Sequence, residues 1–535
     1  MKNNIEKFRK EQNASFAKNV IMLAGAQIAV KVLGLIYKII IVNVPGFGNE
    51  GNGFYSTGYQ LYMVLLAISS IGIPNVVSKM VSERVALGDY RGAHKVFRTS
   101  MFLISMLGLI LSLFMFIFAR TISLLLFKTE GVAYTMMALS PAVFFVSSNS
   151  VLRGYFTGLG SLKSTSISEI IEQLFNCILS ILFVYMMMGK STAIMAAAGN
   201  LSTTVAVLIS LGYMTSHYLL RRKFIKEQCK NQTADIRANK TSSLTKNIIL
   251  LALPASFASL VSTLSGNIDS ITVSTYTGNV EAYGLISKTE TLTHLPLALG
   301  ATLFMAMVPV ISSKIATDDR QGAIKQLTDT LFLNNIVIFP CTAGFIILAD
   351  PLLKLLFPAV SDGATILKLQ TVAMLFASVT FVLNGAFYGL GKQKFPAIIL
   401  LFGAILKLIL NIVVLKIFDL GVEFAVIATI VYQALVTLAE WIILKKYLPF
   451  KMDVRKQFTK PLFATVVMSG MVLLSYNMFI VKLNNTISTL ASIVFGAIVY
   501  FIVLAMLKTL DEDDLLALPM GSKIVTIMKK FKLIK

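Results

Sequence analysis

Two stretches of this chain, 231 residues apart, carry nearly the same pattern. Residues 152–163 are LRGYFTGLGSLK and residues 383–394 are LNGAFYGLGKQK, which share two leucines, three glycines, a phenylalanine and a lysine. Residues 17–23 and 245–251 (AKNVIML and TKNIILL) match at nearly the same spacing. Because an offset that stays near 230 residues is the signature of a duplicated unit, we expect two copies of one structure in tandem.

The composition places this duplicated structure in a membrane. Hydrophobic residues make up 56% of the 535 residues, charged residues only 14%, and the mean hydropathy is +0.77. Soluble domains carry about 25% charged residues, so this chain lacks the charge to cover several water-facing surfaces. We therefore expect the chain to face lipid.

Helices that cross the bilayer need about 20 apolar residues to span roughly 30 Å of hydrocarbon. The sequence predicts an all-α polytopic protein with fourteen such helices, arranged as two parallel six-helix repeats plus two C-terminal helices. An even number of spans in each copy gives both copies the same orientation, and such repeats place a substrate site at their interface near the midplane. The predicted spans are residues 18–42, 54–80, 99–119, 132–152, 166–188, 193–219, 247–275, 283–312, 328–349, 364–388, 396–416, 422–443, 461–481 and 487–507.

Lysine and arginine are distributed unequally between the two sides of the membrane. The chain has 48 of them against 26 acidic residues, a net charge of +22 and a pI near 9.7. If the N-terminus is cytoplasmic, 37 of the 48 lie in cytoplasmic segments, seven at the outer side and four inside spans. Since cations concentrate in cytoplasmic loops, we expect a multi-pass protein of the bacterial cytoplasmic membrane with both termini cytoplasmic and an uncleaved first span. Contact with anionic lipid headgroups then accounts for the high pI, and no nucleic-acid partner is predicted.

The spans and the basic segments between them suggest a division of the chain. We expect an N-lobe at residues 1–220 (helices 1 to 6), a basic cytoplasmic linker at 221–246 and a C-lobe at 247–443 (helices 7 to 12). Residues 444–460 then form a basic cytoplasmic loop, residues 461–507 helices 13 and 14, and residues 508–535 a cytoplasmic tail.

Motifs that resemble enzyme signatures have simpler explanations here. Residues 46–51, GFGNEG, match the dinucleotide fingerprint, but they follow a membrane span rather than a strand, which favours a helix-to-helix turn. Residues 189–192, GKST, lack the first glycine of a P-loop. The sequence shows no paired carboxylates, no Ser/His/Asp set and no metal-ligand spacing, and its three cysteines cannot form a disulfide framework. We expect a transporter without cofactor, not an enzyme.

Of the four lysines inside predicted spans, three are candidate functional residues, because a charge at the bilayer centre costs about 2.5–3.5 kcal/mol. Lys31 and Lys38 lie seven residues apart on one face of the first span, and Lys288 lies near the outer end of the eighth. Thr291 and His294 follow Lys288 at three-residue spacing on one stripe. These five side chains are the predicted substrate-binding residues.

Each intramembrane charge also has a structural interpretation. For Lys31, a position in a water-filled cavity is preferred to an ion pair. Lys38 lies close enough to the interface that its ammonium could extend there instead of lining a site. Lys288 favours a cavity but has Glu290 as a candidate partner. Asp269 in the seventh span is either a cation site, with Na⁺ as the candidate ion, or a partner of Lys288. Lys407 in the eleventh span is as well explained by an interhelical pair as by a site.

A cavity that combines lysines with hydroxyl groups suits an anionic, polyhydroxylated substrate. Each polar group moved through hydrocarbon without a partner costs about 2–7 kcal/mol, so a sugar headgroup cannot cross unaided. Export of an anion from a negative interior releases about 2.3 kcal/mol per charge per 100 mV. A pyrophosphate-linked headgroup therefore has a driving force without ATP.

Several motifs together are similar to those of the multidrug/oligosaccharidyl-lipid/polysaccharide (MOP) exporter superfamily. Within it the chain resembles the polysaccharide biosynthesis proteins of the stage V sporulation protein B type, relatives of the lipid II flippase MurJ. The matching motifs are KVLGLIY at 31–37, Gly51-x-Gly53-x-Tyr55, Gly72-Ile73-Pro74 with Ser78-Lys79, and His294-Leu295-Pro296 with Val308-Pro309.

The resemblance implies a V-shaped, two-lobe fold with a central cavity lined by helices 1, 2, 7 and 8. In MurJ-like members helices 13 and 14 form a groove for the lipid tail. Essential cations in helices 1 and 8 of the family support roles for Lys31, Lys38 and Lys288, and Asp269 resembles an acidic residue at a sodium site in some relatives. The chain departs from the MurJ pattern in helix 8, where Thr291 and His294 replace an arginine and a glutamate.

We therefore expect a flippase that moves an undecaprenyl-pyrophosphate-linked glycan, such as the peptidoglycan precursor lipid II, to the outer leaflet by alternating access. It would act as a monomer, use Na⁺ or the membrane potential, and work beside cell-wall synthesis proteins in vegetative growth or sporulation. The alternatives are a cation-coupled multidrug exporter of the same superfamily and a non-transporting scaffold for envelope glycan synthesis.

Overall fold

The computed structural model describes residues 30–230, 241–507 and 509. Within these ranges the chain forms helices and loops and no β-strand, because a helix satisfies all its backbone hydrogen bonds internally in lipid. Residues 30–42 are helical. The later helices are α2 (Gly48–Ser69), α3 (Ile73–Ala86), α4 (Tyr90–Phe127), α5 (Gly131–Gly158), α6 (Leu162–Met186), α7 (Thr192–Lys230), α8 (Thr241–Thr277), α9 (Val280–Ala316), α10 (Arg320–Ile347), α11 (Ala349–Leu356), α12 (Ala364–Gly389), α13 (Lys394–Ile412), η1 (Val413–Ile417), α14 (Val422–Tyr447), η2 (Arg455–Thr459), α15 (Lys460–Ile480) and α16 (Asn485–Met506).

Twelve helical segments of the described residues are long and apolar enough to cross a membrane. The chain is thus a multi-pass, all-helical membrane protein. Of the two other predicted spans, residues 18–42 begin outside the described residues and residues 247–275 lie within α8. The predicted N-terminal tail and nearly all of the tail at 508–535 also lie outside them. The total of fourteen spans stays a prediction.

The second predicted span, residues 54–80, is broken in the structure. α2 ends at Ser69 and α3 begins at Ile73, with Pro74 in the first turn of α3. Proline has no N–H to donate, and the first turn of a helix leaves its N–H groups unpaired, so proline suits this position. The apolar character continues through this break, which is why hydropathy alone predicts a single helix.

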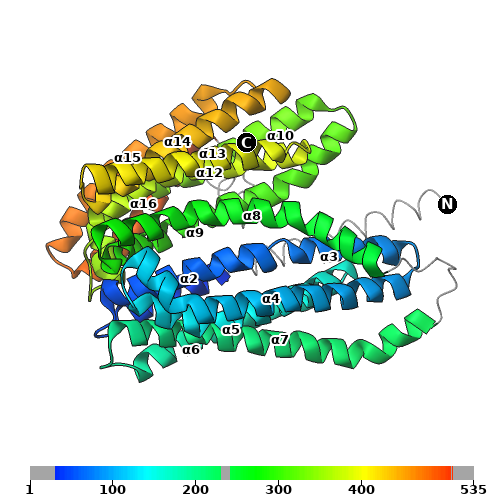
Figure 1. Cartoon of the computed structure of the whole chain (residues 1–535). Helices are drawn as coiled ribbons and strands as arrows, with labels where there is room; N and C mark the ends of the chain where they lie inside the picture. Colours follow the sequence, from blue (N-terminus) through cyan, green and yellow to red (C-terminus); the bar gives the residue numbers. More distant parts are fainter. Residues whose placement is uncertain (1–29, 231–240, 508, 510–535) are drawn as a thin grey trace. The chain divides into compact units, whose positions relative to one another are not determined.

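The chain divides into two compact units, residues Met1–Lys288 and Thr289–Lys535. In the first unit α4, α5 and α7 run side by side, and α8 packs against α2 and α4 (Figure 1). In the second unit α12 packs against α10 and α14, and α15 packs against α10 and α16. The division falls within α9, and the lobe boundaries expected from the sequence stay a prediction.

Glycines of the duplicated pattern make the same kind of contact in each unit. A Cβ atom on Gly158 of α5 would lie 2.7 Å from Cβ of Val81 on α3. A Cβ atom on Gly389 of α12 would likewise lie 2.7 Å from Cβ of Ile311 on α9. Because real Cβ atoms do not approach this closely, glycine permits the helices to meet at both places.

The helix starts of α4 and α10 also correspond. Asp89 accepts a hydrogen bond from the backbone N–H of Gly92 at 2.8 Å, and Asp319 accepts one from Gly322 at the same distance. Aspartate at this position satisfies a backbone donor that the first turn of a helix leaves unpaired. These matched contacts agree with duplication, while the complete repeat layout stays a prediction.

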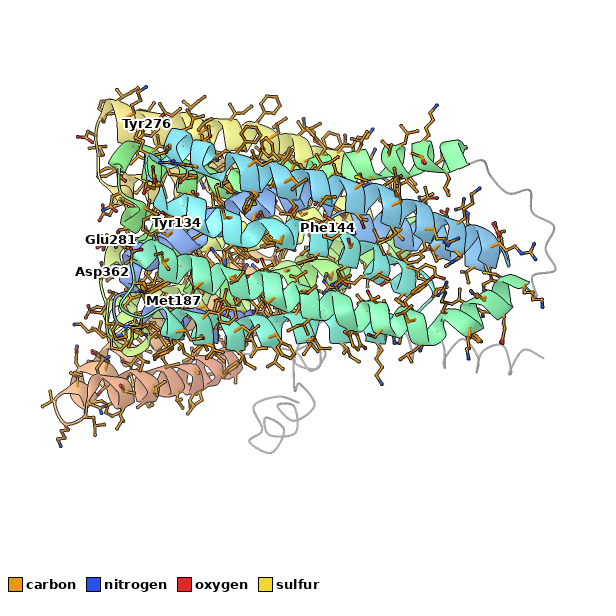
Figure 2. All side chains as sticks on the ribbon, turned by 60° about the horizontal axis from the view of Figure 1, so that its bottom comes forward. Tyr134, Phe144, Met187, Tyr276, Glu281 and Asp362 are labelled. Atoms are coloured by element: carbon orange, nitrogen blue, oxygen red, sulfur yellow. The ribbon has the colours of Figure 1, made fainter. Side chains whose placement is uncertain are left out.

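Large apolar side chains cover the outward faces of the helices, as Figure 2 shows along the first unit. On α4, Phe102, Phe116 and Ile117 are exposed, whereas Ser100 and Ser123 are buried. This arrangement is the reverse of a soluble helix. It suits a lipid solvent, in which polar side chains belong between helices.

Candidate functional site

α2 and the start of α9 approach closely in the first unit. Gly53 of α2 faces the carbonyl of Val280, and Gly284 of α9 faces the carbonyl of Asn49, each too closely to accommodate a Cβ atom. The side chain of Asn52 donates a hydrogen bond to the Gly284 carbonyl at 2.6 Å. Small residues at such a crossing allow two backbones to meet, so these glycines set the distance between α2 and α9.

Lys38 points between helices. It is 6% exposed and lies one turn before the end of helical residues 30–42. Its Nζ donates a hydrogen bond to Ser56 Oγ at 2.9 Å and lies 4.5 Å from the centroid of the Tyr55 ring. A cation over an aromatic face is attracted by the ring quadrupole. The ammonium is therefore held within the first unit rather than extended to its surface.

Ser56 is the centre of a network that joins three helices. Its hydroxyl accepts hydrogen bonds from Lys38 and from Ser287 of α9, the latter at 2.7 Å, and donates one to Asn52 Oδ1 at 3.4 Å. A hydroxyl has one proton to donate and two lone pairs, so Ser56 uses its full capacity. Replacing it would disturb both α9 and Lys38.

Lys288 follows Ser287 and is 0% exposed. Figure 2 shows Glu281, near the start of α9, at the same end of the first unit as Tyr134 and Met187. At 1.5 Å per residue, Lys288 lies about 10 Å further along the helix than Glu281. Lys38 and Lys288 are thus two buried amines of the first unit, and both Lys38 and the residue before Lys288 bond Ser56. An anion would be strongly attracted to buried amines.

The remaining predicted site residues are less buried. Lys31 is exposed, two helical turns before Lys38, and Asp269 is half-buried on α8. Thr291 is half-buried in the second unit, and His294 is exposed there with its Nε2 3.5 Å from a carboxylate oxygen of Glu290. Among the residues described here, no three His, Cys, Asp or Glu side chains gather as a metal site.

Sequence patterns alone miss the residues that hold the network together. Ser56, Ser287 and Asn52 are ordinary polar residues, and none is charged. One signal was available for Ser56. A helical hairpin that turns within residues 43–47 brings the start of α2, with Ser56, alongside the helix that carries Lys38.

A second polar cluster lies where the sequence predicts a cytoplasmic loop. Arg153 lies inside α5, with Nη2 2.7 Å from a carboxylate oxygen of Glu172 on α6. The same guanidinium donates hydrogen bonds to Ser168 and Ser210 at 3.1 and 3.2 Å. Because α5 continues to Gly158, this arginine belongs to the helical bundle and not to the loop after it.

Comparison with known protein families shows to which family the chain belongs. The family described as "Polysaccharide biosynthesis protein" matches residues 16–315, more than half of the chain. The chain belongs to the polysaccharide biosynthesis protein family. A second family, MatE, matches residues 254–413.

Relatives of this family member include curated bacterial proteins. It is 23% identical to stage V sporulation protein B of Bacillus subtilis (strain 168) over 521 residues, which cover 96% of this chain and 99% of the relative. It is 24% identical to the lipid II flippase MurJ of the same organism over 443 residues, 78% of this chain and 80% of MurJ.

Solved structures share the fold of this chain. A lipid II flippase MurJ in an inward closed conformation matches with a TM-score of 0.70 at 16% identity, over 91% of this chain and 98% of that one. An inward-facing MATE family transporter of the MOP superfamily matches with a TM-score of 0.67 at 14% identity, over 80% of this chain and 98% of that one. The chain therefore has the MATE/MurJ-like fold expected from its motifs.

Proposed function

We propose that this protein is a flippase that moves an undecaprenyl-pyrophosphate-linked glycan from the inner to the outer leaflet by alternating access. The observation that carries the proposal is the burial of two amines, Lys38 and Lys288, in the first unit, where Lys38 and Ser287, the residue before Lys288, both bond Ser56. Buried amines in apolar helices carry a free-energy penalty. Binding of a pyrophosphate group is a function that would explain why they are present.

The same substrate explains the hydroxyl and amide groups around the amines. Sugar hydroxyls need hydrogen-bond partners when they leave water, and Ser56, Ser287 and Asn52 supply such groups once the helices move apart. In this proposal Lys31, Thr291 and His294 also contact the headgroup during the cycle, while Asp269 is a candidate Na⁺ ligand. The membrane potential alone supplies about 2.3 kcal/mol per exported negative charge per 100 mV.

The proposed setting is the bacterial cytoplasmic membrane, with both termini in the cytoplasm and the protein acting as a monomer. Similarity to stage V sporulation protein B and to MurJ supports a cargo used in envelope or spore construction. At 23–24% identity lipid II is one cargo within that class, and the exchange of helix 8 residues at Thr291 and His294 leaves room for another prenyl-linked glycan.

A drug exporter is the second candidate, because the MatE family matches residues 254–413 and a MATE transporter shares the fold. Complementation separates the two functions. A bacterium depleted of its own lipid II flippase is supplied with this protein, and lipid II at the outer leaflet is measured by external labelling. Restored labelling supports the flippase, and a K38A/K288A variant should not restore it. Drug resistance without restored labelling would support the exporter.

A further inference from the structure

A buried acid in the second unit has no role in the amine site. Glu440 lies on α14, which packs against α12, α13 and η1. It is 1% exposed, and it lies seven residues before the end of the helix at Tyr447. A buried acid in a membrane helix lowers the stability of the protein, so its presence there indicates a functional role.

The carboxyl group of Glu440 lacks the partners that an ionised acid needs. Its Oε2 is buried with no hydrogen-bond partner, and none of the ion pairs among the described residues includes it. The nearest polar side chain one turn earlier, Thr437, donates to carbonyl oxygens and shares a 2.9 Å hydrogen bond with Thr380 of α12. The hydroxyl of Thr437 thus bonds Thr380 and backbone carbonyls and not the carboxyl group of Glu440.

Charged and titratable groups on the surrounding helices do not neutralise it. On α13, Lys407 is buried, but its Nζ lies 5.6 Å from the ring of Tyr432, which is about 12 Å before Glu440 along α14. Lys445 of α14 is exposed, with Nζ 5.7 Å from the Trp441 ring. The other such groups on these elements are exposed: Lys368 and Tyr388 of α12, Lys394 of α13, Lys416 of η1, and Glu423, Lys446 and Tyr447 of α14.

An acceptor for a protonated acid lies at the same level of the bundle. Asn384 of α12 is one turn beyond Thr380, and its Oδ1 is also buried without a hydrogen-bond partner. Because α13 connects them as one span, α12 and α14 run in the same direction, so Asn384 and Glu440 both lie one turn beyond the Thr380–Thr437 contact. A protonated carboxyl group has an O–H to donate, whereas a carboxylate has only acceptors.

We propose that Glu440 is a proton-binding site and that its loading and release are coupled to the transport cycle. In the enclosed state the carboxyl O–H bond is intact. When α12 and α14 separate and water enters, that bond breaks, the proton leaves to water, and the carboxylate is hydrated; the reverse step reloads it. The protonation of Glu440 stands independently of the proposed function, whereas its coupling to transport rests on it.

Infrared difference spectroscopy on the full-length protein in lipid tests the protonation directly. We expect the wild type at pH 7 to show a protonated carboxyl C=O band that shifts in D₂O, is absent from E440Q, and is retained in E423Q, which changes an exposed glutamate on the same helix. A band that persists in E440Q would overturn the proposal. An E440M variant guards against misfolding, because a neutral buried acid tolerates neutral replacement. Loss of folding in both E440Q and E440M would contradict a neutral Glu440.

Transport of lipid II in reconstituted vesicles tests the coupling. A proton gradient should accelerate translocation several-fold in the wild type and in E423Q but leave E440Q unchanged. Equal acceleration of E440Q, or acceleration by a sodium gradient that E440Q abolishes, would overturn proton coupling. If the wild type moves no lipid II, the proposed cargo fails, and the infrared result alone decides the proton site.

Discussion

Lys38 donates a 2.9 Å hydrogen bond to Ser56, eighteen residues away in the next helix. This contact turns a costly intramembrane charge into part of an ordered network, because Ser56 also accepts a hydrogen bond from Ser287 beside the fully buried Lys288. The amine site therefore depends on the position of α9 as much as on the lysines themselves.

Replacing Ser56 by alanine tests this dependence. The change removes the hydroxyl that accepts hydrogen bonds from Lys38 and Ser287, so we expect a loss of about 1–3 kcal/mol in stability and slower transport. Thermal unfolding in detergent and vesicle transport measure the two effects. The control is S82A, which removes an exposed hydroxyl bonded only to the carbonyl of Lys79 in its own helix. Equal behaviour of S56A and S82A would contradict the network.

A methyl group at Gly284 should separate α9 from α2. A Cβ atom there would overlap the carbonyl oxygen of Asn49, and overpacking of this kind costs about 1–3 kcal/mol. We expect G284A to unfold at lower temperature than the wild type. Gly266 on α8 has no atom within 4 Å of an added Cβ, so G266A should be neutral or slightly stabilising. Equal stability of the two variants would show that α2 and α9 do not meet as described.

The ion pair between Arg153 and Glu172 should behave as a coupled unit. Both side chains are half-buried, at 16% and 30% exposure, so the loss on removing one member should be smaller than the roughly 3–5 kcal/mol of a fully buried pair. R153M and E172Q should each destabilise the protein, and the double variant should lose less than the sum of the two. A double-mutant cycle with additive losses, within about 0.5 kcal/mol, would exclude the pairing.

Acid should weaken the start of α10. The backbone N–H of Gly322 and the ammonium of Lys314, 3.2 Å away, hold the pKa of Asp319 below its ordinary value. A lowered pKa gives stability that is complete above the ordinary value, about 3.9, and is lost as the pH falls through the lowered one. The stability difference between wild type and D319N should therefore shrink as the pH falls from 5 to 3. A constant difference would contradict the lowered pKa, and D318N provides the exposed neighbouring control.

Much of the fold follows from the sequence because lipid imposes a simple pattern. Apolar length and the position of cations indicate the helices. The structure adds that two of the repeated glycines, Gly158 and Gly389, lie where helices cross. Hydropathy does not detect the break at residues 70–72, because the apolar pattern continues through it. It also places Arg153 in a loop, because a window of hydropathy takes no account of a partner such as Glu172 on another helix.

Of the residues in the site, only the charged ones could be predicted from the sequence. Lys38 and Lys288 stand out because charges are rare in membrane helices, and both are buried. The side chains that orient them belong to other helices and are common polar residues, so only the three-dimensional structure shows which ones act. The sodium-site role of Asp269 and the contacts of Lys31, Thr291 and His294 with substrate remain predictions.

The most direct test of the central claim is translocation of lipid II by the purified protein in vesicles, compared between wild type, K38A, K288A and K354A. Lys354 is an exposed lysine paired with Asp350 at 2.6 Å, so it controls for the loss of a positive charge. If the buried amines bind the pyrophosphate, K38A and K288A should insert normally and translocate about 10- to 100-fold more slowly, the value of one charge-assisted hydrogen bond, while K354A matches the wild type. Wild-type rates in both K38A and K288A would contradict the account.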